Sequence, residues 1–258
     1  MSRLKNKWVL ITGASSGFGA AAACAFGAEG CKLLLGARRQ EKLKAVATAA
    51  KKAGALTALY HPLDVTKTAS VESFIAWAKE KTGKLDVLIN NAGGAHGLDP
   101  IATATDEDWE ATLQTNVFGL LRMTRAALPL VVSNPGSCII NIGSLAGHTA
   151  YENGAAYCAA KAGERKITQA LRLEMYGTGV RVCSLDPGLS ESEFSVVRFK
   201  GDQARAKKVY EGTHPLQPED IAETMVWVAS RPAHVNIDEI LIKPTDQAAI
   251  YKLYRRTK

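Results

Sequence analysis

The sequence predicts an α/β fold in which helices cover both faces of a parallel sheet of about seven strands, forming three layers. Short apolar runs alternate along the chain with helical segments, which is the pattern of parallel β–α–β units. The 258 residues, 47% of them hydrophobic, are sufficient for one such domain with a large core. The predicted strands are residues 8–12, 32–36, 56–61, 85–90, 137–142, 180–185 and 239–242.

Helical segments fill the gaps between these runs, including residues 70–81, 106–131 and 154–176. Acidic residues at positions 106–108 favour a helix start, because negative charge stabilises a helix N-terminus. Pro129 is expected to kink or end its helix, since proline has no N–H to donate. We find no internal repeat, low-complexity tract or linker, so a single domain covering residues 1–258 is expected.

The segment between the sixth strand and the helix expected near Pro218 is unusually long. Residues 186–215 are charged and contain one clear helical patch, at 203–211. Connections of this length in a compact domain are usually functional, often as covers over a site. The segment begins at the carboxyl end of a strand, where ligands bind in open α/β sheets. We therefore expect a substrate lid at about residues 189–215, and "the lid" below means this segment.

A glycine-rich turn, Gly13-Ala14-Ser15-Ser16-Gly17-Phe18-Gly19, joins the first strand to an alanine-rich helical segment. Strand, glycine turn and helix in this order are the context of a dinucleotide-binding site. Gly13 permits the tight turn, Gly17 lets the backbone approach a pyrophosphate, and Gly19 allows close helix–strand packing. The spacing differs from the commoner Gly-x-Gly-x-x-Gly, and a purely structural turn is the alternative.

The end of the second strand indicates which cofactor is bound. The sequence there is Leu35-Gly36-Ala37-Arg38-Arg39, without the acidic residue that would bind the ribose 2′-hydroxyl of NAD. Arg38 can make a bidentate contact with a 2′-phosphate and stack on the adenine, and Arg39 can add positive charge. We therefore expect NADP in preference to NAD. The alternative is two solvated arginines at a helix start.

Tyr157 and Lys161 are four positions apart in a helical segment, so their side chains share one face. A free tyrosine has a pKa of about 10, too high for efficient proton transfer at neutral pH. An ammonium at ~4 Å would lower the Tyr157 pKa by ~3 units. Tyr157 could then exchange a proton with an alcohol or carbonyl oxygen held by the Ser144 hydroxyl. An accidental surface pair is the alternative reading.

These motifs resemble the short-chain dehydrogenase/reductase family over nearly the whole chain. The resemblance implies a doubly wound, Rossmann-type sheet, a nicotinamide cofactor and a Ser–Tyr–Lys centre. It also implies that Asn116 assists through a water-mediated proton relay via Lys161. The segments that match are residues 12–19, Asp64-Val65, Asn90-Asn91-Ala92-Gly93, Asn116, Ser144, Tyr157 with Lys161, and Pro187-Gly188.

The same resemblance assigns further cofactor contacts. Asp64 would accept a hydrogen bond from the adenine amino group, Asn91-Ala92-Gly93 would pass beside the cofactor, and the Ser192 hydroxyl would bind the nicotinamide amide. Two positions depart from the family pattern: Gly143 replaces a common serine, and Ser190 stands where valine is usual.

The lid sequence 193–202 resembles the branch of NADP-dependent 3-hydroxy acid (serine) dehydrogenases, whose relatives reduce sulfoacetaldehyde or similar short aldehydes. We expect a small polar, anionic substrate, anchored through its carboxylate or sulfonate by Arg198, with Lys200 as a possible substitute and Tyr151 lining the pocket. One alternative is a reductase of bulkier neutral ketones or aldehydes. Another is an idle cofactor-binding scaffold, against which the intact Ser144, Tyr157 and Lys161 argue.

Composition limits the other classes. The five cysteines form no Cys-x-x-Cys pair and the five histidines show no ligand spacing, so neither a disulfide framework nor a metal site is expected. Cys158, beside Tyr157, is expected to pack rather than react. No apolar run nears the ~18 residues of a membrane span and no signal peptide is evident, so a cytoplasmic protein is expected.

The net charge of +7 suits an anionic cofactor and substrate, so no nucleic-acid partner is expected, although residues 254–258 form a basic cluster. Family resemblance implies that helices 106–131 and 154–176 pair between subunits. Their many small residues favour that pairing, and we expect a homotetramer.

Overall fold

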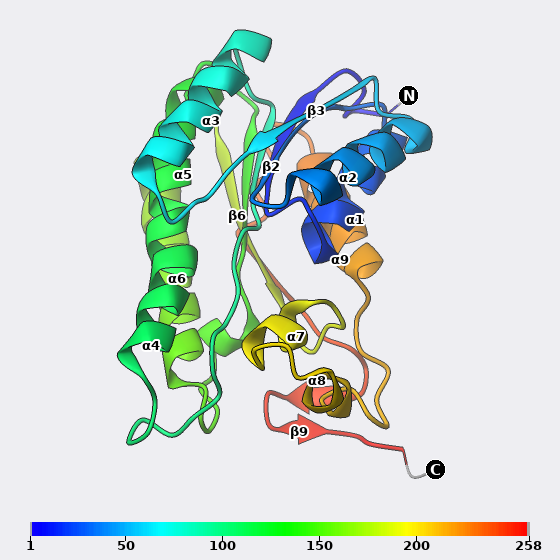
Figure 1. Cartoon of the computed structure of the whole chain (residues 1–258). Coiled ribbons are helices and arrows are strands. Elements are labelled where there is room, and N and C mark those ends of the chain that lie inside the picture. The colour runs from blue at the N-terminus through cyan, green and yellow to red at the C-terminus, as the bar shows by residue number, and fades with distance from the viewer. Residues whose placement is uncertain (1, 257–258) are drawn as a thin grey trace.

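Seven parallel strands form the central sheet of the computed structural model, which describes residues 2–256 (Figure 1). Their order across the sheet is β3-β2-β1-β4-β5-β6-β7. The predicted strands and the doubly wound, Rossmann-type fold are confirmed, with ends shifted by two residues at most. The strands are β1 (Trp8–Thr12), β2 (Lys32–Ala37), β3 (Thr57–Pro62), β4 (Val87–Asn90), β5 (Cys138–Ile142), β6 (Arg181–Pro187) and β7 (Glu239–Ile242).

Helices cover both faces of this sheet (Figure 1). One face carries α1 (Gly17–Ala28), α2 (Gln40–Ala53) and α9 (Pro218–Ala229). The other carries α3 (Thr68–Lys81), α5 (Gly119–Val132) and α6 (Ala155–Glu174). Strands covered on both faces are buried throughout rather than on alternate residues, and β4, β5 and β6 are buried at every position, although β6 carries the polar residues Arg181, Ser184 and Asp186.

The helix predicted over residues 106–131 is in fact three segments. They are α4 (Asp106–Leu113), a π-helical turn η1 (Gln114–Phe118) and α5. Thr105 caps α4 by accepting from the Asp108 N–H, beside the three acidic residues of the first turn. Pro129 does not end its helix, which was one of the two predicted outcomes: it lies inside α5, which continues to Val132. Because proline has no N–H, α5 lacks the hydrogen bond that residue 129 would otherwise donate to the Arg125 carbonyl.

The lid contains two short helices instead of the single predicted patch. They are α7 (Phe194–Arg198) and α8 (Gln203–Lys208), and both lie beyond one end of the sheet, at the bottom of Figure 1. A small antiparallel pair, β8 (Gln247–Ala249) and β9 (Lys252–Leu253), lies beside them and was not predicted. Thr257 and Lys258, the last residues of the basic cluster, lie outside the described part of the chain.

Candidate active site

A cleft of about 340 Å³ opens where the strands end, between the glycine turn and the lid. We call it the cofactor cleft. It brings together most of the residues that the sequence predicts for cofactor binding, although they come from distant parts of the chain. Those lining it are Gly13, Ser15, Ser16, Gly17, Phe18, Arg38, Arg39, Asp64, Val65, Asn91, Ala92, Gly93, Tyr157, Lys161 and Ser192.

The glycine turn is fixed by a close approach to the segment after β4. Gly13 has φ +64°, and a Cβ there would come within 2.9 Å of Ala92 Cα. Thr12 Oγ1 accepts hydrogen bonds from the backbone N–H groups of Asn91 (3.0 Å) and Ala92 (2.9 Å). Gly19 is buried rather than lining the cleft, and a Cβ there would come within 2.6 Å of the Gly13 carbonyl. The turn therefore leaves no room for side chains at Gly13 or Gly19.

Pro187 and Gly188, predicted as cofactor contacts, do not line the cofactor cleft. Pro187 ends β6, and a Cβ on Gly188 would overlap the Gln247 side chain. Gln247 Oε1 accepts a hydrogen bond from the Leu189 N–H at 2.7 Å. In this structure the Pro-Gly pair therefore packs against β8 and sets the start of the lid.

Arg39, which the sequence predicts only to add positive charge at the end of β2, has three side-chain partners. Its guanidinium donates to Ser15 Oγ (3.2 Å) and Ser16 Oγ (2.6 Å) and pairs with the Glu193 carboxylate at 2.8 Å. Arg38 is exposed and lines the cleft. Two guanidinium groups and two hydroxyls at a site without a strand-end carboxylate suit a 2′-phosphate, so the residues present fit NADP.

Glu193 and Asp64 are both held ionised beside this positive charge. The hydrogen bond from Lys42 lowers the pKa of Glu193 most; burial opposes it, but the further hydrogen bonds from Arg39 and Ser16 help to bring the pKa down to about 2. Burial opposes ionisation of Asp64, but hydrogen bonds from Thr66 and the charge of Arg38 lower its pKa below the usual value. Asp64 Oδ1 accepts from the Thr66 hydroxyl at 2.7 Å and the Thr66 N–H at 3.0 Å.

Tyr157 lies in the first turn of α6, with cationic groups near its ring. Lys161 Nζ is 5.9 Å from the ring centroid, and Arg198 Cζ, from the lid, is 5.8 Å from it. Phe194 of α7 packs against the same ring, with centroids 5.3 Å apart. The predicted Tyr–Lys pair is thus covered by the lid, and Arg198 comes close to it.

Ser144 and Asn116 occupy local irregularities beside α6. Ser144 follows β5 and caps the short helix η2 (Leu145–Gly147), its Oγ accepting from the Ala146 N–H at 3.1 Å. A Cβ on Gly147 would come within 2.8 Å of the Lys161 carbonyl, so η2 packs directly on α6. Asn116 lies within the π-turn η1, where its amide donates to the Gly94 and Thr112 carbonyls at 2.7 Å each. Single π-turns of this kind often occur at functional sites.

Arg198 ends α7 and docks the lid onto the loop after β4. Its Nε donates to the Gly97 carbonyl at 3.1 Å, and its guanidinium carbon is 5.3 Å from the Tyr151 ring centroid. Burial raises the pKa of Tyr151 to about 12, against the opposing charge of Arg198. A small cavity of about 20 Å³ touches Arg198 and Tyr157, but its lining does not include Tyr151.

Lys200, the suggested substitute for Arg198, is engaged elsewhere. Its ammonium lies 2.9 Å from Asp108 of α4, and the side chain is 65% exposed. That contact raises the Lys200 pKa above its usual value. Among the described residues Arg198 forms no ion pair with a carboxylate, so its charge stays available to a ligand.

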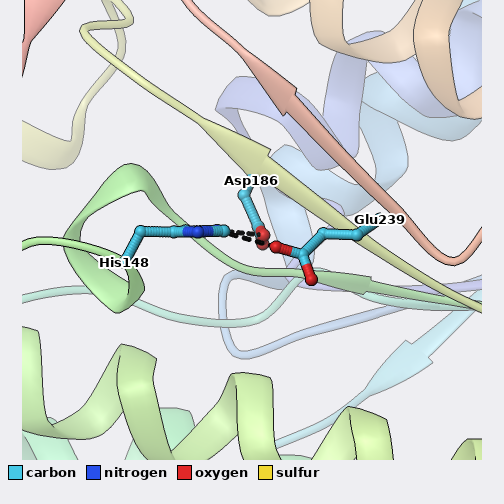
Figure 2. A group of neighbouring side chains, drawn as sticks. All are labelled: His148, Asp186 and Glu239. Atoms are coloured by element: carbon cyan, nitrogen blue, oxygen red, sulfur yellow. Dashed lines mark hydrogen bonds and ion pairs between the residues drawn. The ribbon is translucent and has the colours of Figure 1, made fainter.

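The sequence reading missed two groups of charged side chains next to this site. Lys161 Nζ donates to the Ile142 carbonyl (2.7 Å) and to the carboxylate of Glu164 (2.6 Å), one turn further along α6. Figure 2 shows the second group, which is only partly buried: His148, just after η2, meets Asp186 of β6 and Glu239 of β7. The Lys161–Glu164 pair could have been predicted, because residues three positions apart on a helix are neighbours. No sequence spacing indicates that His148, Asp186 and Glu239 meet.

Hydrogen bonds and ion pairs hold the three side chains of Figure 2 together. His148 Nε2 lies 2.7 Å from Asp186 Oδ2 and 3.2 Å from Glu239 Oε1, so one ring nitrogen serves both carboxylates. Ser184 Oγ donates to the other Asp186 oxygen, and Arg165 pairs with Glu239. Each member therefore has protein partners, and the arrangement ties β6 and β7 to η2.

All five cysteines are free thiols, and Cys158 is buried in α6. Over residues 2–256, no helix combines the length and apolarity needed to cross a membrane.

Comparison with known proteins identifies the family. A sequence model described as short chain dehydrogenase matches residues 7–202. The chain belongs to the short-chain dehydrogenase family. The resemblance on which the sequence reading relied is therefore confirmed.

Curated and structural relatives agree with one another. The chain is 45% identical over 241 residues to the NADP-dependent 3-hydroxy acid dehydrogenase YdfG of Salmonella typhi, covering 93% of this chain and 96% of that protein. The serine 3-dehydrogenase of Agrobacterium fabrum is 37% identical over 252 residues, with 96% and 98% covered. A solved structure of the closed form of serine dehydrogenase complexed with NADP+ matches with TM-score 0.89 and 40% identity, over 97% of this chain and 100% of that one.

Proposed function

We propose that this short-chain dehydrogenase is an NADP-dependent oxidoreductase that interconverts a small anionic hydroxy compound and its aldehyde or ketone. The observation that carries the proposal is the position of Arg198. Its guanidinium lies within 6 Å of the Tyr157 ring, whereas Lys161 approaches the same ring from α6. A substrate oxygen at Tyr157 would thus lie close to a cation able to hold the substrate's own charge.

The residues that would hold NADP are those of the cofactor cleft. The N-terminus of α1 offers backbone N–H groups to the pyrophosphate, and Arg38 and Arg39 offer their guanidinium groups to the 2′-phosphate. Ser192, from the lid, lines the same cleft near Gly17. When bound, the nicotinamide supplies or accepts the hydride that the protein itself cannot provide.

Proton transfer falls to Tyr157. Its hydroxyl would give a proton to the carbonyl oxygen in reduction and take one from the alcohol in oxidation. The Ser144 hydroxyl would hold that oxygen, and the Lys161 ammonium would stabilise negative charge on the phenol oxygen. Asn116 would not contact the substrate. It would take part in the water-mediated proton relay through Lys161 that the family resemblance implies.

Arg198 is a better candidate than Lys200 for the substrate anchor. Lys200 already pairs with Asp108, whereas the described residues give Arg198 no carboxylate partner. A guanidinium can hold a carboxylate or a sulfonate through two parallel hydrogen bonds. This supports 3-hydroxy acids as the substrate class, in agreement with the names of the curated relatives, and sulfoacetaldehyde carries an anionic group that the same guanidinium could hold. Tyr151 would position Arg198 by packing on it.

The proposal is tested by following NADPH oxidation with a panel of short aldehydes and oxo acids, sulfoacetaldehyde, and bulky neutral ketones. The anionic compounds should have the highest kcat/KM, and Tyr157→Phe should lose about 10²- to 10⁴-fold of it, the range for a general acid or base. The Tyr176→Phe variant, changed at an exposed tyrosine just beyond α6, serves as the control and should keep full activity. Preference for the bulky neutral ketones would overturn the substrate class, and full activity of Tyr157→Phe would overturn the mechanism.

A further inference from the structure

The lysine of the proposed catalytic pair, Lys161, forms an ion pair with a buried carboxylate. Glu164 and Lys161 are one helical turn apart on α6, and their side chains are only 5% and 6% exposed. Glu164 Oε2 lies 2.6 Å from Lys161 Nζ, whose second described acceptor is the Ile142 carbonyl. Since a buried charge is strongly affected by its partners, this contact bears directly on the field that Lys161 exerts at Tyr157.

The surroundings of Glu164 make its own charge sensitive to pH. Burial raises the pKa of Glu164 to about 7, because the ion pair with Lys161 offsets the loss of hydration only in part and the Asp186 carboxylate adds repulsion. Burial alone would lower the pKa of Lys161, but Glu164 foremost, followed by Tyr157 and Asp186, raises it above the usual value. Lys161 therefore stays charged, whereas Glu164 titrates near neutrality.

Two titratable groups face this pair directly, and two more act through one of them. Tyr157 lies on α6 itself, and Asp186 lies on β6. Asp186 is in turn hydrogen-bonded to His148, which follows η2, and His148 also contacts Glu239 of β7. From η1, the neighbouring side chain is Asn116, a neutral amide: a Cβ on Gly93 would lie 2.7 Å from Asn116 Oδ1 and 3.6 Å from Lys161 Nζ.

We propose that Glu164 is a positioning residue that determines how much of the Lys161 positive charge acts on Tyr157. It thereby sets the pH at which Tyr157 changes from proton donor to proton acceptor. When Glu164 is ionised, its negative charge compensates the ammonium, so Tyr157 keeps its proton to higher pH. That state favours reduction of a carbonyl, which needs a proton donor. The inference rests on the proposed roles of Tyr157 and Lys161.

The test is Glu164→Gln, which keeps the size of the side chain and an oxygen that can accept from Lys161 but removes the charge. The pH at half-maximal kcat/KM for alcohol oxidation should fall by about one unit, which corresponds to a change of ~1.4 kcal/mol in the free energy of ionising Tyr157. Glu174→Gln, which removes an exposed carboxylate from the same helix, should leave the profile unchanged. A Glu164→Gln profile that superimposes on the wild type would overturn the inference.

A second readout does not depend on turnover. Tyrosinate absorbance of the cofactor-free protein is titrated with and without Tyr157→Phe, so that the difference isolates Tyr157. This titration step should move to lower pH in Glu164→Gln, and by a smaller amount in Glu164→Asp, whose shorter carboxylate withdraws from Lys161. If the glutamine variant does not fold, the aspartate variant decides the matter, and no shift there would contradict the inference. Loss of the proposed function would appear separately, as full activity in Tyr157→Phe.

Discussion

The Glu193 carboxylate of the lid joins helix α2 at the edge of the cofactor cleft, with Oε2 2.8 Å from Arg39 Nη2 and Oε1 2.6 Å from Lys42 Nζ. All three side chains are between 43% and 48% exposed, so the contact is accessible to solvent. The guanidinium proposed to hold a 2′-phosphate is therefore already shared with the lid. A phosphate at this position would compete with Glu193 for Arg39.

We therefore expect Glu193→Gln to strengthen binding of 2′,5′-ADP by several-fold, the range for an exposed ion pair of up to about 1 kcal/mol. The fragment carries the 2′-phosphate but no nicotinamide, so other lid contacts should not contribute. Calorimetric titration measures the change, and 5′-AMP, which lacks the 2′-phosphate, should bind equally to both proteins. Glu191→Gln, at an exposed position two residues earlier, is the matched control.

The depressed pKa of Glu193 fixes the pH dependence of this effect. Its folded value of about 2 lies below its ordinary value of 4.5, so the stability it contributes is fully present above pH 4.5 and is lost as the pH falls through about 2. The difference in the free energy of unfolding between wild type and Glu193→Gln should thus persist from neutral to mildly acidic pH. A difference that disappears near neutrality would show that Glu193 is not held as the structure has it.

The two arginines at the end of β2 can be distinguished by substitution. Arg38→Leu should raise KM for NADP by roughly 10- to 150-fold, as expected for the loss of a charge-assisted contact of ~1.5–3 kcal/mol. Arg39→Leu should also raise it and should in addition release Glu193. KM for NAD, which has no 2′-phosphate, should change far less in both variants. Equal wild-type efficiency with NAD and NADP would contradict the cofactor preference.

Gly143 stands where relatives often have serine, and its packing supplies a reason. A Cβ at this position would overlap the Asp186 carboxylate, which Ser184 and His148 hold in place. Gly143→Ala should lower the free energy of unfolding by about 1–3 kcal/mol, a typical cost of overpacking, as measured by urea denaturation. Gly83→Ala, with nothing within 4 Å of the added Cβ, should be nearly neutral.

A double-variant cycle checks the cause. If the Asp186 carboxylate is the obstacle, Gly143→Ala should cost clearly less in an Asp186→Ala background than in the wild type. An equal cost in both backgrounds would assign the effect to something other than this contact.

The expected tetramer concerns the outer surface of η1 and α5. Phe118 and Leu121 expose 46% and 41% of their surface there, on the predicted pairing helices. Light scattering should give about four times the chain mass of 27.6 kDa. Phe118→Glu with Leu121→Glu should lower it, and Leu56→Glu, at an exposed leucine before β3, should not. A wild-type mass near 27.6 kDa would contradict the prediction.

Sequence reasoning worked where one local pattern determines the outcome. Short apolar runs identified all seven strands, because strands in a sheet covered by helices are rich in apolar residues. The glycine turn was recognisable because backbone close approach excludes side chains at Gly13 and Gly19. Tyr157 and Lys161 share a helical face through their spacing alone.

It failed where the decisive partner is distant in sequence or the element is short. No local pattern brings His148, Asp186 and Glu239 together, because three different elements carry them. The five-residue helix α7 is too short for a periodic signal, and its position depends on packing of Phe194 against Tyr157. The π-turn η1 appeared as continuous helix because its residues suit either helical form.

The proposed substrate class depends on Arg198 binding the anionic group of the substrate beside Tyr157. The most direct measurement compares kcat/KM for 3-hydroxypropionate with that for its uncharged amide, in the wild type, Arg198→Ala and Lys200→Ala. We expect Arg198→Ala to remove most of the efficiency toward the acid while sparing the amide. Arg198→Lys should restore it only partly, and Lys200→Ala should change neither. An equal proportional loss of both substrates in Arg198→Ala would contradict the proposed substrate class, leaving a general aldehyde or ketone reductase with a damaged lid.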